Sequence, residues 1–152
     1  MQLSQEQPGD LRATVNAVLT LDALAGVIFS AMKQIEHPTV VSMKRDDEFR
    51  DLLAERCHEF RALRDLAAAY KHGELTNPKK KQPRLLAGPE RLNRVENQIG
   101  VLECDDEIEG FVLVVELIDE SFLRASSVIG VSYQLLAPIV DEVDPLHTRW
   151  QA

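Results

Sequence analysis

The chain has 152 residues, of which 45% are hydrophobic and 28% charged. This length suits one domain with a core of its own, and the composition is that of a globular protein rather than a disordered or fibrous one. The net charge of −8 argues against a general nucleic-acid coat protein. Without a signal-peptide pattern or an uncharged apolar run of about 18 residues, we expect a cytoplasmic protein that does not enter a membrane.

The two cysteines, Cys57 and Cys104, form no CxxC pair, so we expect two reduced thiols. Drawing them together with His58 and His72 would give a zinc site, but none of the spacings is that of a zinc finger. The chain also has no GxSxG elbow, P-loop or Rossmann glycine pattern. We therefore expect no metal and no cofactor.

Three helices are expected in the first half of the chain. Asp10 is a candidate N-cap for a helix from Leu11 to about Gln34, which ends before His37-Pro38. Acids at 46–48 suit the first turn of a second helix, and a third runs from about Glu59 to Lys71, with Gly73 as its C-terminal stop. The broad apolar stripe of the first helix predicts a homodimer.

The second half is expected to mix strand and helix. A proline-bounded loop covers 76–89, and two strands at Gln98–Cys104 and Gly110–Ile118 would form a hairpin around an acidic turn. A helix from about Ala125 to Val143 completes the core. The fold class is thus α+β and predominantly helical, in a single domain 1–152. Its parts are a helical region (about 10–73), a basic loop region (74–97), the hairpin with the last helix (98–143) and a tail (144–152).

Positive charge is concentrated between residues 61 and 94, where nine Lys or Arg face three acids, a local charge of +6 in a chain of −8. On the third helix, at 100° per residue, Arg61, Asp65 and His72 share one polar face, with Arg64 and Lys71 in a second row. Histidine can move a proton, Arg or Lys can hold a phosphate, and Asp65 could orient the imidazole. The candidate catalytic residues are Arg64 and His72. Candidates for nucleic-acid or partner binding are Arg61, Lys71, Lys79, Lys80, Lys81 and Arg84.

The string RALRDLAAAYKHGEL, residues 61–75, resembles a stretch of uncharacterised bacterial and phage proteins in which a helix ends in Lys-His. It also resembles the HEPN superfamily. That resemblance implies a helical bundle, often dimeric, and often a ribonuclease with an Arg-x4–6-His motif. In this chain seven residues separate Arg64 from His72, which is one more than the motif allows.

Each of these features also has a purely structural interpretation. Cations followed by glycine suit a helix C-terminus, Arg61 and Asp65 have the spacing of an ordinary surface ion pair, and a lysine run between prolines is usually a solvated loop. We therefore expect a non-enzymatic interaction or assembly protein of bacterial or phage origin, with an acidic protein as its partner. The alternative is a HEPN-like RNA-binding protein or ribonuclease that acts through Arg64, Lys71 and His72.

Overall fold

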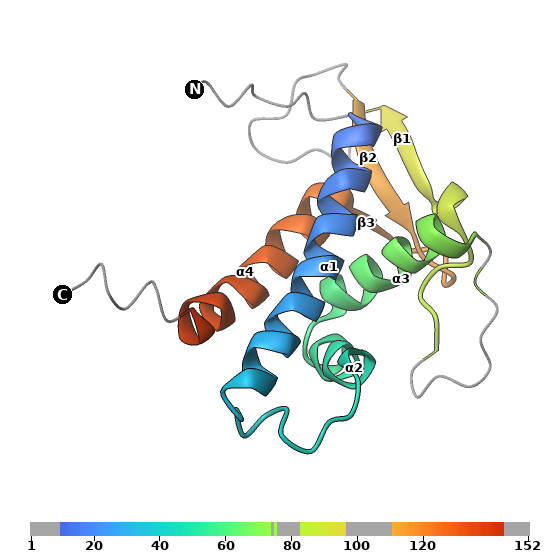
Figure 1. Cartoon of the computed structure of the whole chain (residues 1–152). Helices are drawn as coiled ribbons and strands as arrows, with labels where there is room; N and C mark the ends of the chain where they lie inside the picture. The colour runs from blue at the N-terminus through green and yellow to red at the C-terminus, as the bar shows by residue number, and fades with distance from the viewer. Residues whose placement is uncertain (1–9, 74, 76–82, 97–110, 145–152) are drawn as a thin grey trace, which may run out of the picture.

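Helices make up most of the computed structural model, which describes residues 10–73, 75, 83–96 and 111–144 (Figure 1). In this part of the chain the helices are α1 (Leu11–Gln34), α2 (Asp46–Arg56), α3 (His58–His72) and α4 (Ala125–Val143), and a 3-10 turn (Pro89–Arg91) precedes the first strand. A small antiparallel sheet lies between α3 and α4 in chain order. The α+β, mostly helical class expected from the sequence is confirmed.

Helix α1 is the element around which the other helices pack. The Asp10 side chain caps it by accepting hydrogen bonds from the backbone N–H groups of Arg12 and Ala13, as predicted. The helix contacts α2, α3 and α4 and buries its apolar stripe among them. Burial of each large side chain contributes about 2 kcal/mol. The buried apolar residues of the stripe are Val18, Leu21, Ala25, Ile28, Phe29 and Met32.

By length and composition alone, α1 could also cross a membrane. The core helix of a soluble protein passes the same test. Here α1 carries Asp22 in its middle, and that carboxylate pairs with cations from α2 and α3. Such pairing suits a helix packed inside a protein.

Helices α2 and α3 follow each other with one residue between them. Cys57 has an extended backbone, and its sulfur accepts a hydrogen bond from the N–H of Phe60, which caps α3. At the other end Gly73 takes a positive φ of 78°, a conformation that glycine adopts without steric cost. The predicted stop at Gly73 is confirmed. It makes Lys71 and His72 the last two residues of α3.

Three strands form the sheet in the order β1-β2-β3, all antiparallel: β1 (Leu92–Glu96), β2 (Phe111–Glu116) and β3 (Phe122–Arg124). The register pairs Leu92 with Val115 and Glu96 with Phe111. The second predicted strand corresponds to β2. The first, Gln98–Cys104, and the acidic turn after it lie outside the described residues.

Strand β1 falls in the region that we assigned to the basic loop. Its sequence, LNRVE, does not alternate cleanly between apolar and polar residues. Arg94 lies 4.3 Å above the ring of Phe111, so an arginine occupies a position where the strand pattern calls for an apolar side chain. The strand pattern missed β1 because polar residues occupy three of its five positions. The three residues of β3 were too few to predict.

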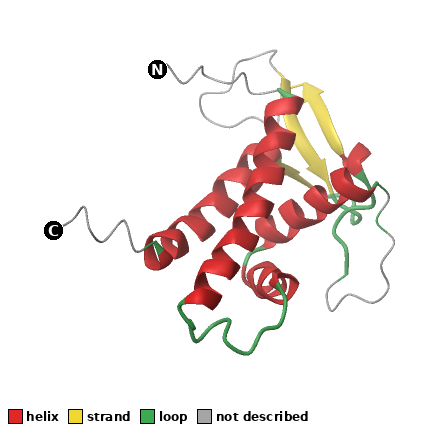
Figure 2. Cartoon of the chain, in the orientation of Figure 1, coloured by secondary structure: helices red, strands yellow, loops and turns green. Residues whose placement is uncertain are grey.

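Figure 2 shows the sheet packed beside the helices, and the sheet and helices share one core. Alternate residues of β2 and its extension, Leu113, Val115 and Leu117, join the apolar cluster of the helices. Helix α4 contacts β2, β3, α1 and α3. With these contacts α3 is held between α2 and α4, and its polar residues meet α1 and α2.

Candidate functional site

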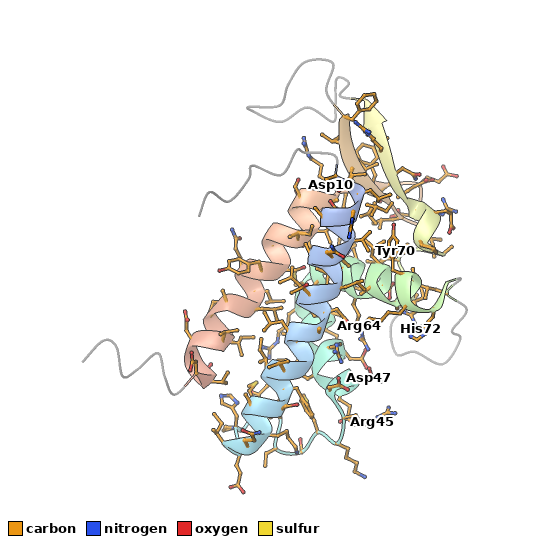
Figure 3. All side chains as sticks on the ribbon, turned by 45° about the horizontal axis from the view of Figure 1, so that its top comes forward. Asp10, Arg45, Asp47, Arg64, Tyr70 and His72 are labelled. Carbon is orange, nitrogen blue, oxygen red and sulfur yellow. The ribbon has the colours of Figure 1, made fainter. Side chains whose placement is uncertain are left out.

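A polar pocket of about 300 Å³ opens where α1, α2 and α3 meet the segment that begins at residue 83. It brings together four predicted site residues: Arg64, Lys71, His72 and Arg84. Arg61 does not line it, and Lys79, Lys80 and Lys81 lie outside the described residues. Figure 3 shows Arg64 close to Asp47, with His72 further along α3. The complete lining is Asp22, Asp47, Arg50, Arg64, Ala68, Lys71, His72 and Arg84.

Asp22 of α1 is the innermost acid of the pocket, with 6% of its surface exposed. Its carboxylate accepts a hydrogen bond from Lys71 Nζ at 2.7 Å and lies 3.3 Å from Arg50 Nε. Arg50 also donates to the backbone carbonyl of Asp22. A buried carboxylate needs such partners, because an unpaired charge in the interior costs several kcal/mol (about 3–5).

Arg50 is held from its own helix as well. It donates to Asp46, one turn earlier on α2, and this hydrogen bond lowers the pKa of Asp46 below its ordinary value of 3.8. The guanidinium passes so close to α1 that a Cβ on Gly26 would lie 2.8 Å from Arg50 Nη2. A helical glycine at this position therefore leaves the space that Arg50 occupies.

Arg64 of α3 is buried, with 8% of its surface exposed. It donates to Asp51 of α2, and its Nη2 lies 3.8 Å from Oδ1 of Asp47. The sequence placed Arg64 at the edge of the apolar stripe. The structure adds that α2 supplies two carboxylates to it, so its guanidinium is held in one orientation.

Asp65 anchors the segment after residue 82. One carboxylate oxygen accepts from Arg84 Nη1 at 2.5 Å, and the other accepts from the N–H of Leu85 at 2.7 Å. Arg61 donates to the carbonyl of Pro83. The predicted Arg61–Asp65 pair on a solvated face is therefore wrong, because Asp65 is 5% exposed and both side chains bind the segment that follows α3.

His72 is exposed at the last position of α3. No described residue hydrogen-bonds to its imidazole, and Asp65, which we expected to orient it, has both oxygens occupied by other donors. A histidine that works as a general base is normally held by a second group. In the described part of the chain this support is missing.

The pocket nevertheless keeps hydrogen-bond donors for a ligand. Arg64 Nε and Nη2, Arg84 Nη2 and two of the three Lys71 N–H groups have no acceptor among the described residues, by the donor counts of these side chains. Three arginines, one lysine and two acids line the pocket. Such a lining can bind an oxyanion by charge-assisted hydrogen bonds. Among the described residues no group of three His, Cys, Asp or Glu could hold a metal ion.

Three charged pocket residues were not proposed from the sequence: Asp22, Asp47 and Arg50. Asp22 could have been identified from the sequence, because a lone acid in the middle of a buried apolar helix needs a cationic partner. Asp46 and Arg50 have the i, i+4 spacing of a helical ion pair. That Arg50 then reaches across to α1 depends on how the two helices pack, and no local pattern predicts it.

A second hollow, of about 560 Å³, lies beside the N-terminal end of α1. Its lining includes Leu11, Val15 and Tyr70, and burial raises the pKa of Tyr70. Arg94 also borders it, but its guanidinium already lies over Phe111. None of the predicted site residues lines this hollow, so the polar pocket remains the candidate site.

Comparisons with protein-family models, with curated proteins and with solved structures found no match to this chain. The function proposed below therefore depends on the pocket alone.

Proposed function

We propose that the protein is a non-enzymatic interaction protein that holds an anionic group of an acidic protein partner in the polar pocket. The observation that carries this proposal is the convergence of Arg64, Lys71 and Arg84 on one pocket, each with N–H groups left for a ligand. Aspartates behind these cations fix them in place, so a ligand does not have to order them.

Binding is favoured over catalysis by the surroundings of His72. A proton-transfer role requires an imidazole held in a defined orientation. His72 is exposed, and its expected partner Asp65 instead binds Arg84 and Leu85. In the part of the chain that the structure describes, the pocket thus has the donors of a binding site, and no group there orients the imidazole of His72.

The test is binding of a fluorescent poly-glutamate peptide at low salt, measured by anisotropy. Lys71→Gln should weaken binding about tenfold, the order of one charge-assisted hydrogen bond. Lys44→Gln removes an exposed lysine outside the pocket. It should change the affinity for the peptide by less than about twofold, as expected for a charge screened by solvent. No binding by the parent protein, or equal losses in the two variants, would overturn the proposal.

A second candidate is a HEPN-like RNA-binding protein or ribonuclease. The specific observation in its favour is that Arg64 and His72 line the same pocket, although their spacing along the chain is longer than that of the HEPN motif. Here the phosphate would take the place of the partner's carboxylate, and Lys79, Lys80 and Lys81, close to Arg84 in the sequence, would add salt-dependent attraction to the RNA backbone.

The same assay with a single-stranded RNA probe separates these functions. Cleavage that His72→Ala abolishes, in a protein that remains folded, would establish a ribonuclease. Binding without cleavage, with a steep salt dependence that neutralising the three lysines reduces and that ignores His72, would indicate plain electrostatic RNA binding. An RNA probe that neither binds nor is cut removes this candidate.

A further inference from the structure

Asp47 differs from the other aspartates around the pocket. Four of them, Asp22, Asp46, Asp51 and Asp65, accept hydrogen bonds from the cations that they neutralise. Asp47 lies 3.8 Å from Arg64 Nη2, beyond hydrogen-bond distance, and accepts no hydrogen bond from a described side chain. Its side chain is 56% exposed. Among the described acids of this site, Asp47 is the one whose side chain no hydrogen bond holds in place.

Asp47 also lines the pocket, on the side of Arg64 that has donors to spare. An incoming oxyanion that hydrogen-bonds to Arg64 Nη2 therefore has to take the place that the carboxylate of Asp47 now occupies beside it. The two negative groups would otherwise face each other at a few ångströms, where like charges repel. Because Asp47 is exposed, it can turn away into solvent, but it then gives up its attraction to Arg64.

We propose that Asp47 competes with ligands for the pocket. Its carboxylate occupies the anion position beside Arg64, so a partner's oxyanion binds only if its interaction with the cations is strong enough to displace Asp47. This inference rests on the proposed function, since it concerns the same pocket and the same ligand chemistry. Asp47 thus weakens the binding of any anion, so that only an anion held strongly by the cations of the pocket displaces it.

A helical position offers a different explanation for Asp47, which the test has to exclude. Asp46, Asp47 and Glu48 all lie in the first turn of α2, where acids are favoured by the helix dipole. Glu48 does not line the pocket. The variant Glu48→Gln therefore removes one negative charge from the same helix turn without touching the proposed competition, and is a matched control for Asp47→Asn.

The experiment measures the affinity of the parent, Asp47→Asn and Glu48→Gln proteins for the poly-glutamate and RNA probes at one low salt concentration. Removing a like charge a few ångströms from the bound anion should tighten binding by Asp47→Asn about tenfold. Glu48→Gln should change the affinity by less than about twofold, because Glu48 does not line the pocket and its charge is screened by solvent. Unfolding curves of both variants confirm that each is folded.

The outcomes separate the two proposals. If Lys71→Gln weakens binding but Asp47→Asn binds like the parent, or if Glu48→Gln gains as much as Asp47→Asn, the competitor role is wrong while the pocket function stands. If the parent does not bind the poly-glutamate probe, the pocket function fails, and the competitor role, which rests on it, fails with it. A gain confined to Asp47→Asn supports both.

Discussion

Aspartates do most of the positioning at the candidate site, two of them buried (Asp22 and Asp65) and one half-buried (Asp51). Asp22, Asp51 and Asp65 each accept from one cation of the pocket lining, and Asp65 in addition binds the N–H of Leu85. A buried ion pair adds little net stability compared with an apolar pair of the same size, but the loss of one partner is costly. The role of these acids is therefore to define where the cations lie.

Asp65→Asn tests this at the residue scale. The amide keeps the size of the side chain but leaves Arg84, whose side chain is 12% exposed, without its counter-charge. We expect the free energy of unfolding to fall by about 3 kcal/mol, measured by urea denaturation. Glu55→Gln, an acid-to-amide change at an exposed position of α2, should change it by less than about 0.5 kcal/mol. Similar losses in the two variants would contradict the anchoring role.

At the scale of elements, the close approach of α2 to α1 depends on a missing side chain. Gly26 lies in the middle of α1, where glycine costs about 1 kcal/mol relative to alanine. Arg50 crosses over it and donates to the carbonyl of Asp22 with Nη2 at 3.0 Å. The weaker helix propensity is thus offset by contacts between the two helices.

Replacing Gly26 by Ala should therefore destabilise the protein, against the usual trend for a helical glycine. The new Cβ would lie 2.8 Å from Arg50 Nη2, and the guanidinium would have to give up its hydrogen bonds to α1. We expect a net loss of about 1 kcal/mol in the free energy of unfolding, since lost hydrogen bonds outweigh the gain in propensity.

Gly130 of α4 is the matched control. An added Cβ there meets no atom within 4 Å, so Gly130→Ala should stabilise the protein by about 0.5–1 kcal/mol. In an Arg50→Ala background, Gly26→Ala should become stabilising as well. A stabilising Gly26→Ala in the parent protein would show that Arg50 moves aside without cost.

At the scale of the whole molecule, the described cations of the basic segment 61–94 do not form an isolated positive surface. Acids that come mostly from elsewhere in the chain neutralise part of its charge: Asp51 pairs with Arg64, Asp22 with Lys71, and Glu116 with Arg91. Part of the local excess of +6 is therefore offset by these pairs in the described part of the chain. This favours a defined pocket for one anionic group over a broad coat for a polyanion.

The homodimer expected from the apolar stripe of α1 stays a prediction. The stripe itself is buried within one chain, so a dimer would have to use outward residues such as Val27 of α1, which is 64% exposed. We expect light scattering at micromolar concentration to give twice the mass of one chain, and Val27→Asp to reduce it, because a charge at an apolar contact is disfavoured. A monomer in the parent protein would contradict the prediction.

The sequence by itself determined the local structure. Asp10, Gly73 and the 3.6-residue apolar periodicity predicted where α1 and α3 begin and end, because caps and amphipathic stripes act within one or two turns of helix. It also located the candidate site, since Arg64, Lys71, His72 and Arg84 all come from the basic segment and line one pocket.

Tertiary structure decided which charges meet. Asp65 has the spacing to pair with Arg61 but binds Arg84, and Asp22 reaches Lys71 from 49 residues away. Strand β1 was missed because polar residues occupy three of its five positions, and one of them, Arg94, lies over Phe111. These contacts depend on how α1, α2, α3 and the sheet pack. A buried charge needs a partner, and that partner can come from any element that packs against it. The sequence located the cations of the pocket, and packing decided which acids hold them and left Asp47 without a hydrogen bond from a described side chain.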